Sequence, residues 1–122
     1  SVNTLIYPGA VSVGFMGKYL RKLEWWKLEP HPELVLENPS PFCLADPGNE
    51  YLFYLRYGGS IKVDLSSQKP SDEFEYRWTD LVNSLDSRSG KIKGGSVVEI
   101  KCPEDYPGVV NFKDWVLHLK KM

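Results

Sequence analysis

The stretch that decides the fold is Asp114-Trp115-Val116-Leu117-His118-Leu119-Lys120, near the end of the sequence. Its large apolar residues Trp115, Leu117 and Leu119 fall on one side of an extended chain, and the residues between them fall on the other. Because successive side chains of a strand point to opposite faces, this period of two predicts a β-strand with one buried face. So apolar a strand cannot stand alone, and we expect earlier strands to flank it and to cover Trp115.

The chain from Phe42 onward can supply those strands. Five segments that Gly or Pro turns separate are predicted strands, namely 42–45, 51–57, 61–66, 74–79 and 97–102. Apolar and polar residues alternate in 61–66, 74–79 and 97–102, whereas both faces of 51–57 are largely apolar, which predicts a central strand. Pro47-Gly48 suits a tight turn, and Gly58-Gly59 suits a two-residue hairpin loop that would join the second segment to the third. The polar stretch 81–93 is interpreted as a long turn or irregular hairpin.

Short strands that follow one another without intervening helices are typical of antiparallel β structure. We therefore expect a mostly β fold, an antiparallel β-sandwich of about six to eight short strands with one N-terminal α-helix. A small barrel is the second candidate for closing the sheet.

The first part of the chain has a different pattern. Apolar residues recur at helical spacing within 14–24, and they are Phe15, Met16, Tyr19, Leu20 and Leu23. This spacing predicts one amphipathic helix whose wide apolar stripe needs a partner surface. The prolines that follow predict an extended connector over 27–41, with a short edge strand at 33–37. We expect a helical segment over 1–29 and a β-sandwich domain over 30–122.

The composition argues against several classes of protein. The chain has 122 residues and a net charge of -1, with 15 basic and 16 acidic residues, which argues against a basic nucleic-acid surface. No apolar run reaches the roughly 20 residues that cross a bilayer. No basic residues precede the first apolar region, as they would in a signal peptide. The sequence begins with Ser1 rather than Met, which suggests an excised fragment or a processed product.

The two cysteines, Cys43 and Cys102, leave two interpretations open. They form a disulfide if the protein is exported, or they are two small buried thiols. The sequence holds no CxxC pair and no Cys/His cluster of the kind that binds structural zinc. We predict no metal ion and no cofactor.

Candidate catalytic residues are sparse. His31 lies between two prolines, and His118 lies on the outward face of the closing strand, with no GxSxG-type turn to supply a nucleophile. Glu73 and Glu75 share one face of a strand and resemble the carboxylate pair of a glycosidase. The same alternation is typical of a solvated strand surface, so we predict no catalytic residue.

The aromatic residues are the most suggestive feature for binding. Carbohydrate-binding surfaces present flat rings to the apolar faces of sugars. The candidate ligand-binding residues are Trp25, Trp26, Tyr54, Trp78 and Tyr106. The competing interpretation is packing, because Trp78 and Trp115 point the same way as core residues and Trp25-Trp26 could wedge the helix against the β domain.

Several segments, taken in order, resemble a known family. They are Trp25-Trp26-Lys27-Leu28-Glu29-Pro30, Tyr51-Leu52-Phe53-Tyr54-Leu55, Ile61-Lys62-Val63-Asp64-Leu65, Arg77-Trp78-Thr79-Asp80, Gly94-Gly95, Pro103 and Asp114-Trp115-Val116-Leu117-His118-Leu119. This sequence resembles the small C-terminal β domain, labelled a collagen-binding domain of a collagenase, that follows the barrel of apiosidase-like (β/α)₈ glycoside hydrolases. The resemblance spans most of residues 25–122. The stretch 80–90 departs from the family pattern because it is longer and more polar.

The resemblance implies a partner and a role. The helix would be a remnant of a preceding (β/α)₈ catalytic domain in a secreted or periplasmic bacterial enzyme. Since no barrel strand is present, no catalytic residue carries over. The expected function is a non-catalytic accessory domain that stabilises the barrel and binds polysaccharide. The alternatives are a structural or protein-interaction module, including collagen binding, and an independent small hydrolase. We also expect no nucleic acid and no membrane span, and we expect self-association through the helix if its stripe is exposed.

Overall fold

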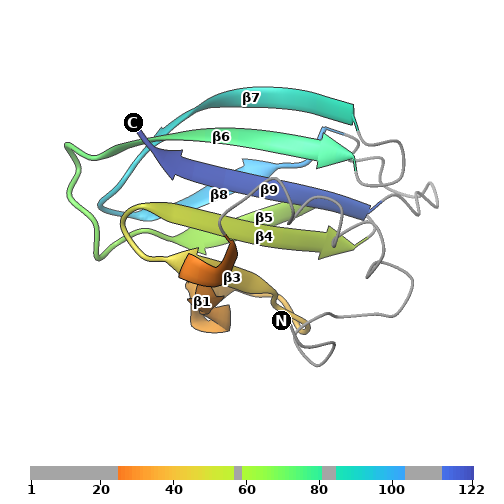
Figure 1. Cartoon of the computed structure of the whole chain (residues 1–122), viewed down its shortest axis with the longest axis horizontal. Coiled ribbons are helices and arrows are strands. Elements are labelled where there is room, and N and C mark those ends of the chain that lie inside the picture. Colours follow the sequence, from red (N-terminus) through yellow and green to blue (C-terminus); the bar gives the residue numbers. More distant parts are fainter. Residues whose placement is uncertain (1–24, 57–58, 81–84, 104–113) are drawn as a thin grey trace.

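The protein is an antiparallel β-sandwich of two stacked sheets (Figure 1). The computed structural model describes residues 25–56, 59–80, 85–103 and 114–122. A six-stranded sheet has the order β1-β3-β4-β9-β6-β7, and a three-stranded sheet has the order β2-β5-β8. The strands are β1 (Glu29–Pro30), β2 (Val35–Leu36), β3 (Cys43–Asp46), β4 (Glu50–Arg56), β5 (Ser60–Asp64), β6 (Glu73–Asp80), β7 (Leu85–Lys93), β8 (Val97–Lys101) and β9 (Asp114–Lys121). The predicted mostly β class and antiparallel sheets are confirmed.

The closing strand β9 lies in the middle of the larger sheet, between β4 and β6 (Figure 1). Leu117 is aligned with Phe53 of β4 on one side and with Trp78 of β6 on the other. Trp115, at 2% exposure, is buried as expected. The period of two in the sequence therefore identified the strand around which the sheet is built.

The main core lies between the two sheets. One face of the six-stranded sheet, the inner face, packs large side chains against apolar residues of the smaller sheet, such as Ile61 and Val63. The rings of Trp78 and Trp115 meet edge to face, with centroids 6.3 Å apart. Their indole nitrogens are both buried, with no hydrogen-bond partner among the described residues, so the packing of the rings holds these tryptophans in place.

The predicted Gly58-Gly59 hairpin is wrong. The strands on either side of it, β4 and β5, belong to different sheets, because β4 pairs with β3 and β9 while β5 pairs with β2 and β8. Gly59 does have a positive φ of 97°, a conformation that glycine adopts at little cost. Its carbonyl accepts a hydrogen bond from the backbone N–H of Cys102. Gly59 thus lies in the connection that takes the chain from the larger sheet to the smaller sheet.

The stretch interpreted as a long turn contains β7, which is the longest of the described strands. It is an edge strand that pairs with β6 alone among the described strands, and polar residues are common on edges because they discourage pairing with other chains. Gly90 is aligned with Tyr76, and a Cβ at Gly90 would lie 2.7 Å from the Tyr76 ring. The glycine therefore makes room for an aromatic side chain across the strand pair.

The proline-rich connector contributes one short edge strand to each sheet. Glu29 and Pro30 pair with Ala45 and Leu44 at one edge of the larger sheet, and the predicted strand at 33–37 appears as β2, at an edge of the smaller sheet. A proline fits there because an edge strand has N–H groups that need no partner strand. Residues 31–34 thus carry the chain from one layer to the other.

Helical structure in the described part is limited to two 3-10 turns, η2 (Trp25–Lys27) and η3 (Pro32–Leu34). Neither turn is long enough to cross a bilayer. The helix predicted at 14–24 lies outside the described residues, and the division into segments 1–29 and 30–122 stays a prediction.

Candidate functional site

The five aromatic candidates do not gather on one surface of the described structure. Trp26 is 65% exposed, whereas Tyr54 is 3% exposed and Trp78 is fully buried. The side chain of Trp25 and the whole of Tyr106 lie outside the described residues. Trp26 is therefore the candidate whose ring the described structure presents to solvent.

Trp26 is positioned by the 3-10 turn η2, which contacts β3 near the edge of the larger sheet. The residue that follows the turn, Leu28, is 8% exposed and anchors it to the domain. A tryptophan ring held on an anchored turn loses little further freedom when a flat apolar ligand stacks on it. This is the arrangement from which a single-ring contact to a sugar can be made.

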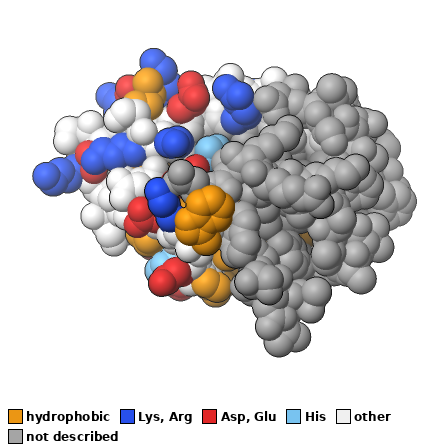
Figure 2. All heavy atoms as spheres, in the orientation of Figure 1, with side chains coloured by type: hydrophobic (Ala, Val, Ile, Leu, Met, Phe, Trp, Pro, Cys, Tyr) orange, Lys and Arg blue, Asp and Glu red, His pale blue; other side chains and the backbone are white. Residues whose placement is uncertain are grey.

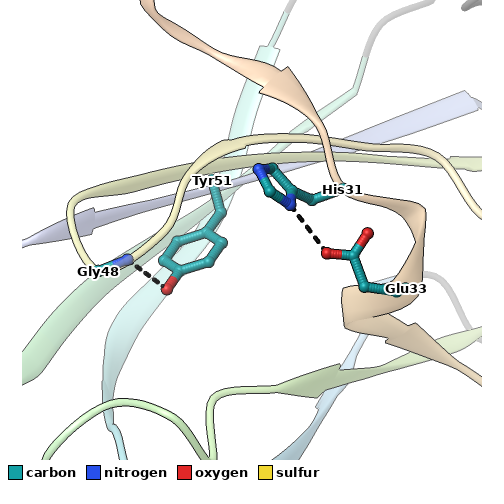
Figure 3. A network of polar contacts seen from close by, with 4 residues as sticks. All are labelled: His31, Glu33, Gly48 and Tyr51. Atoms are coloured by element: carbon teal, nitrogen blue, oxygen red, sulfur yellow. Dashed lines mark hydrogen bonds and ion pairs between the residues drawn. The ribbon is translucent and has the colours of Figure 1, made fainter.

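Polar contacts stiffen the connector and the first hairpin turn (Figure 3). The His31 Nδ1 and Glu33 Oε2 atoms lie 2.8 Å apart, and this hydrogen bond lowers the pKa of the Glu33 carboxyl. The Tyr51 hydroxyl accepts a hydrogen bond of 2.7 Å from the Gly48 N–H, and burial raises the pKa of Tyr51. The tight turn predicted at Pro47-Gly48 is confirmed, with a hydrogen bond from Asn49 N–H to the Asp46 carbonyl. These hydrogen bonds give His31, Glu33 and Tyr51 a structural role in holding the connector and the turn.

The Glu73 and Glu75 carboxylates lie on β6 among basic residues. Glu75 is aligned with Lys120 on one side and Lys91 on the other, and it is exposed. Glu73 is aligned with Lys93 in the same way. The two carboxylates of a glycosidase flank the bond that is cleaved, whereas Glu73 and Glu75 lie side by side along one strand. Glu73 and Glu75 are therefore part of the charged surface of β6.

His118 and Glu50 form a half-buried polar pair on the larger sheet. The His118 Nε2 atom lies 2.5 Å from Glu50 Oε2, with the two side chains 17% and 19% exposed. His118 of β9 is aligned with Arg77 of β6, and Arg77 is aligned in turn with Ser89 of β7. Ser89 is therefore two strands away from His118. Neighbouring strands are about 4.8 Å apart, which places Ser89 beyond hydrogen-bond reach of His118. The pair therefore lacks this serine as a nucleophile.

The two cysteines, Cys43 and Cys102, are both buried and form no disulfide. Burial raises the pKa of the Cys43 thiol, so this sulfur stays protonated and unreactive. The structure therefore agrees with the interpretation of the cysteines as two buried thiols and not as a disulfide. Among residues 25–56, 59–80, 85–103 and 114–122, no three His, Cys, Asp or Glu side chains gather to hold a metal ion.

Comparisons with known proteins agree with the fold. No protein-family model and no curated protein matches the sequence. A solved structure described as a glycoside hydrolase matches with a TM-score of 0.68 and 14% identity, over 93% of this chain and 25% of that chain. A glycoside hydrolase family 5 protein from Bacteroides vulgatus ATCC 8482 matches with a TM-score of 0.67 and 15% identity, over 93% of this chain and 24% of that chain.

At these identities the likeness shows the fold alone. The chain spans about a quarter of the length of each glycoside hydrolase that it matches. It is a small, mostly β domain whose fold recurs as part of larger glycoside hydrolase chains.

Proposed function

We propose that this chain is a non-catalytic accessory domain of a larger bacterial glycoside hydrolase, secreted or periplasmic, in which it stabilises a (β/α)₈ catalytic domain. One observation carries the proposal. Nearly all of this chain, 93%, corresponds in fold to only about a quarter of two glycoside hydrolases. The site geometry supports it, since the candidate carboxylates Glu73 and Glu75 lie on one strand and are aligned with lysines of the neighbouring strands.

The parent enzyme provides the test. It would be identified from the coding sequence upstream of Ser1 and compared with a variant that lacks residues 25–122. We expect the shortened enzyme to keep its active-site residues but to unfold at a lower temperature in calorimetry. Unchanged thermal unfolding, or turnover of a panel of aryl glycosides by this chain alone, would contradict the proposal.

We further propose that the domain contacts carbohydrate through Trp26. The support is that this ring is 65% exposed on a turn anchored by Leu28. Titration calorimetry against plant and host glycans should give binding that Trp26→Ala removes and Trp26→Phe partly keeps. Val97→Ala is the matched control, because Val97 is also an exposed apolar residue, at 47%, on a strand at the edge of the smaller sheet.

A purely structural or protein-interaction role is the second candidate. The observation that favours it is the burial of Tyr54 and Trp78, because buried rings cannot stack on a sugar. Under this candidate no glycan in the panel produces heat, while the shortened parent enzyme is still destabilised. The two experiments together separate the candidates.

A further inference from the structure

The two edges of the six-stranded sheet differ in length and chemistry. One edge is β1, which has two residues and ends in Pro30, a residue without a backbone N–H. The other edge is β7, which has nine residues and pairs with β6 alone among the described strands. In Figure 1, β7 forms the upper border of the larger sheet. A free edge of this length presents backbone groups with which an added strand can pair.

Two lysines of β7 lie on the face of the larger sheet that is turned away from the smaller sheet, which we call the outward face. Phe74 of β6 belongs to the core between the sheets, and Ile92 of β7 is aligned with it and packs against the same core. Because side chains alternate along a strand, Lys91 and Lys93 on either side of Ile92 point outward. Both lysines are exposed. β7 thus offers two cations with a half-buried apolar residue between them.

Each of these lysines ends a row of charges that crosses the outward face. The first row alternates in sign from strand to strand and consists of Glu50, Lys120, Glu75 and Lys91. In the second row, Glu73 is aligned with Lys93. Figure 2 shows this face, in the orientation of Figure 1, with acidic and basic side chains interspersed. Opposite charges on neighbouring strands stabilise a sheet and like charges destabilise it, so the next member of each row, on a strand beyond β7, should be acidic.

We propose that the free edge of β7 receives an extended, acidic segment of another protein as an additional strand. Two carboxylates of the segment are aligned with Lys91 and Lys93, and an apolar side chain between them extends the layer to which Ile92 belongs. The pattern that this edge recognises is therefore acid–apolar–acid in an extended chain. Backbone hydrogen bonds supply affinity, and the two lysines set the register. The interaction does not depend on the carbohydrate contact proposed for Trp26.

The charge of β7 differs from that of β8, which is an edge of the smaller sheet. Ile100 of β8 is buried in the core, so Glu99 and Lys101 on either side of it point outward. These two residues have opposite signs, whereas Lys91 and Lys93 have the same sign. A segment with two carboxylates therefore fits the edge of β7 and does not fit the edge of β8.

The lysines of β7 select against a second copy of this chain as the added strand. A second β7, paired over the same residues, would set lysine against lysine, which is unfavourable. Lysines on an edge discourage pairing in general, but aligned glutamates of β6 offset their charge here. An acidic segment of a different protein meets neither obstacle.

The first test uses the wild-type chain and varies only the added segment. The probes are capped heptapeptides of sequence Thr-Thr-Glu-Val-Glu-Thr-Thr, with counterparts in which both glutamates are replaced by glutamine or by lysine. Binding is followed through the amide signals of ¹H–¹⁵N NMR spectra at low ionic strength. We expect the glutamate probe to shift the amide signals of β7, to slow their hydrogen exchange and to bind about tenfold more tightly than the lysine probe. The amide signals of β8 should stay unchanged.

Three results of this titration would overturn the proposal. If no probe changes the signals of β7, the lysines serve only to keep other strands away. If the three probes bind equally, the charge rows have no part in recognition. If β7 pairs with a second copy at the concentrations used, the edge belongs to a dimer of this chain.

The second test uses matched variants of the full chain. Lys91→Gln with Lys93→Gln removes both cations without setting like charges beside the glutamates of β6. We expect this variant to bind the glutamate probe about threefold more weakly and no more tightly than the glutamine probe. Lys62→Gln with Lys101→Gln removes the same charge from the smaller sheet and should leave binding unchanged. Equal weakening in both variants would mean that net charge attracts the probe, and it would overturn the proposal.

Discussion

The sandwich has two outward faces, and they differ in chemistry. On the three-stranded sheet the outward residues of β5 are polar and reach water, with Lys62 Nζ 2.6 Å from Glu37 Oε2 and the Ser60 hydroxyl 3.3 Å from Glu99 Oε2. On the six-stranded sheet several outward residues of β3, β4 and β9 are apolar and buried, as Leu52 and Val116 illustrate. The outward face of the smaller sheet thus has the residues of a water-exposed surface, whereas that of the larger sheet has residues typical of a covered layer.

The contrast has a physical lesson. One core between two sheets suffices for a domain of this size, so the second buried set is not needed to specify the sandwich. An apolar face left in water promotes association, and such a face persists only where a partner or a further segment covers it. The charge pattern of an outward face therefore tells whether a sheet ends the molecule or continues into another layer.

The largest effect is expected on the inner face, which sets the scale for the comparison. Leu117 is fully buried between Phe53 and Trp78. Leu117→Ala should lower the free energy of unfolding by about 3–5 kcal/mol, because it leaves a cavity that the two sheets cannot close. Urea denaturation followed by circular dichroism measures the loss. A loss near zero would mean that the two sheets are not packed as described.

The second prediction makes the same change on the outward face. Leu52 has the same chemistry and the same full burial as Leu117, on the neighbouring strand β4. If the face is a packed layer, Leu52→Ala should cost about 2–4 kcal/mol in the same denaturation experiment. Lys62→Ala, on the solvated face of the smaller sheet, serves as the control and should leave the midpoint unchanged. Equal, negligible effects for Leu52 and Lys62 would erase the contrast between the faces.

The third prediction compares two His–Glu pairs. His118 and Glu50 are half-buried on the outward face of the larger sheet, whereas Glu33, the partner of His31, is 63% exposed. His118→Gln should lower the free energy of unfolding by about 0.5–1.5 kcal/mol, and the loss should shrink in a Glu50→Gln background. His31→Gln should have little effect because water replaces its partner. A larger effect at His31 would show that the enclosure of the outward pair is unimportant.

The smallest effect concerns a carboxylate of the solvated sheet. The Ser66 hydroxyl and backbone N–H donate hydrogen bonds of 2.5 Å and 2.9 Å to Asp64 Oδ1, and they lower the pKa of Asp64 below its ordinary value of 3.8. Because the folded-state pKa is lowered, these bonds favour folding above pH 3.8, and the benefit disappears as the pH falls through the lowered pKa.

Ser66→Ala removes the hydroxyl donor and should move the pKa of Asp64 upward, toward its ordinary value. Carboxyl ¹³C chemical shifts followed through an acid titration measure this change. Ser60→Ala is the control, because the hydroxyl of Ser60 donates to Glu99 instead. An unchanged Asp64 titration in the Ser66 variant would mean that the backbone N–H alone sets its pKa.

Much of the β structure could be predicted from alternation. Phe74 and Trp78 are fully buried in β6 as their spacing indicates, and Ile100 and Cys102 point inward as predicted. Pairing was harder, because a Gly-Gly turn specifies a change of direction but not the sheet in which the next strand lies. β7 was missed because an edge strand need not be apolar. Its Gly90 leaves space for the Tyr76 ring of the neighbouring strand, a requirement that the local sequence does not reveal.

The candidate site was less predictable than the fold. The sequence shows that the chain is rich in aromatic residues. It does not show which rings are exposed, because the burial of each ring depends on what packs over it in the folded structure. Trp78 was named as a binding candidate with packing as the competing interpretation, and its ring is fully buried. Tyr54 is also buried, although it lies on the outward face of the larger sheet. The enclosed pair of His118 and Glu50 was also missed, since the two residues are 68 positions apart and no local pattern links them. The alignment of β4 with β9 is what brings them together.

The position of β9 has a consequence for synthesis. Of the nine described strands it leaves the ribosome last, yet β4 and β6 both depend on it for hydrogen bonds. Until Asp114 and the residues after it emerge, the two halves of the larger sheet remain unjoined, and the strand edges that will receive β9 stay open to wrong partners. Nascent chains stalled before residue 114 should therefore be the species that chaperones hold and proteases remove.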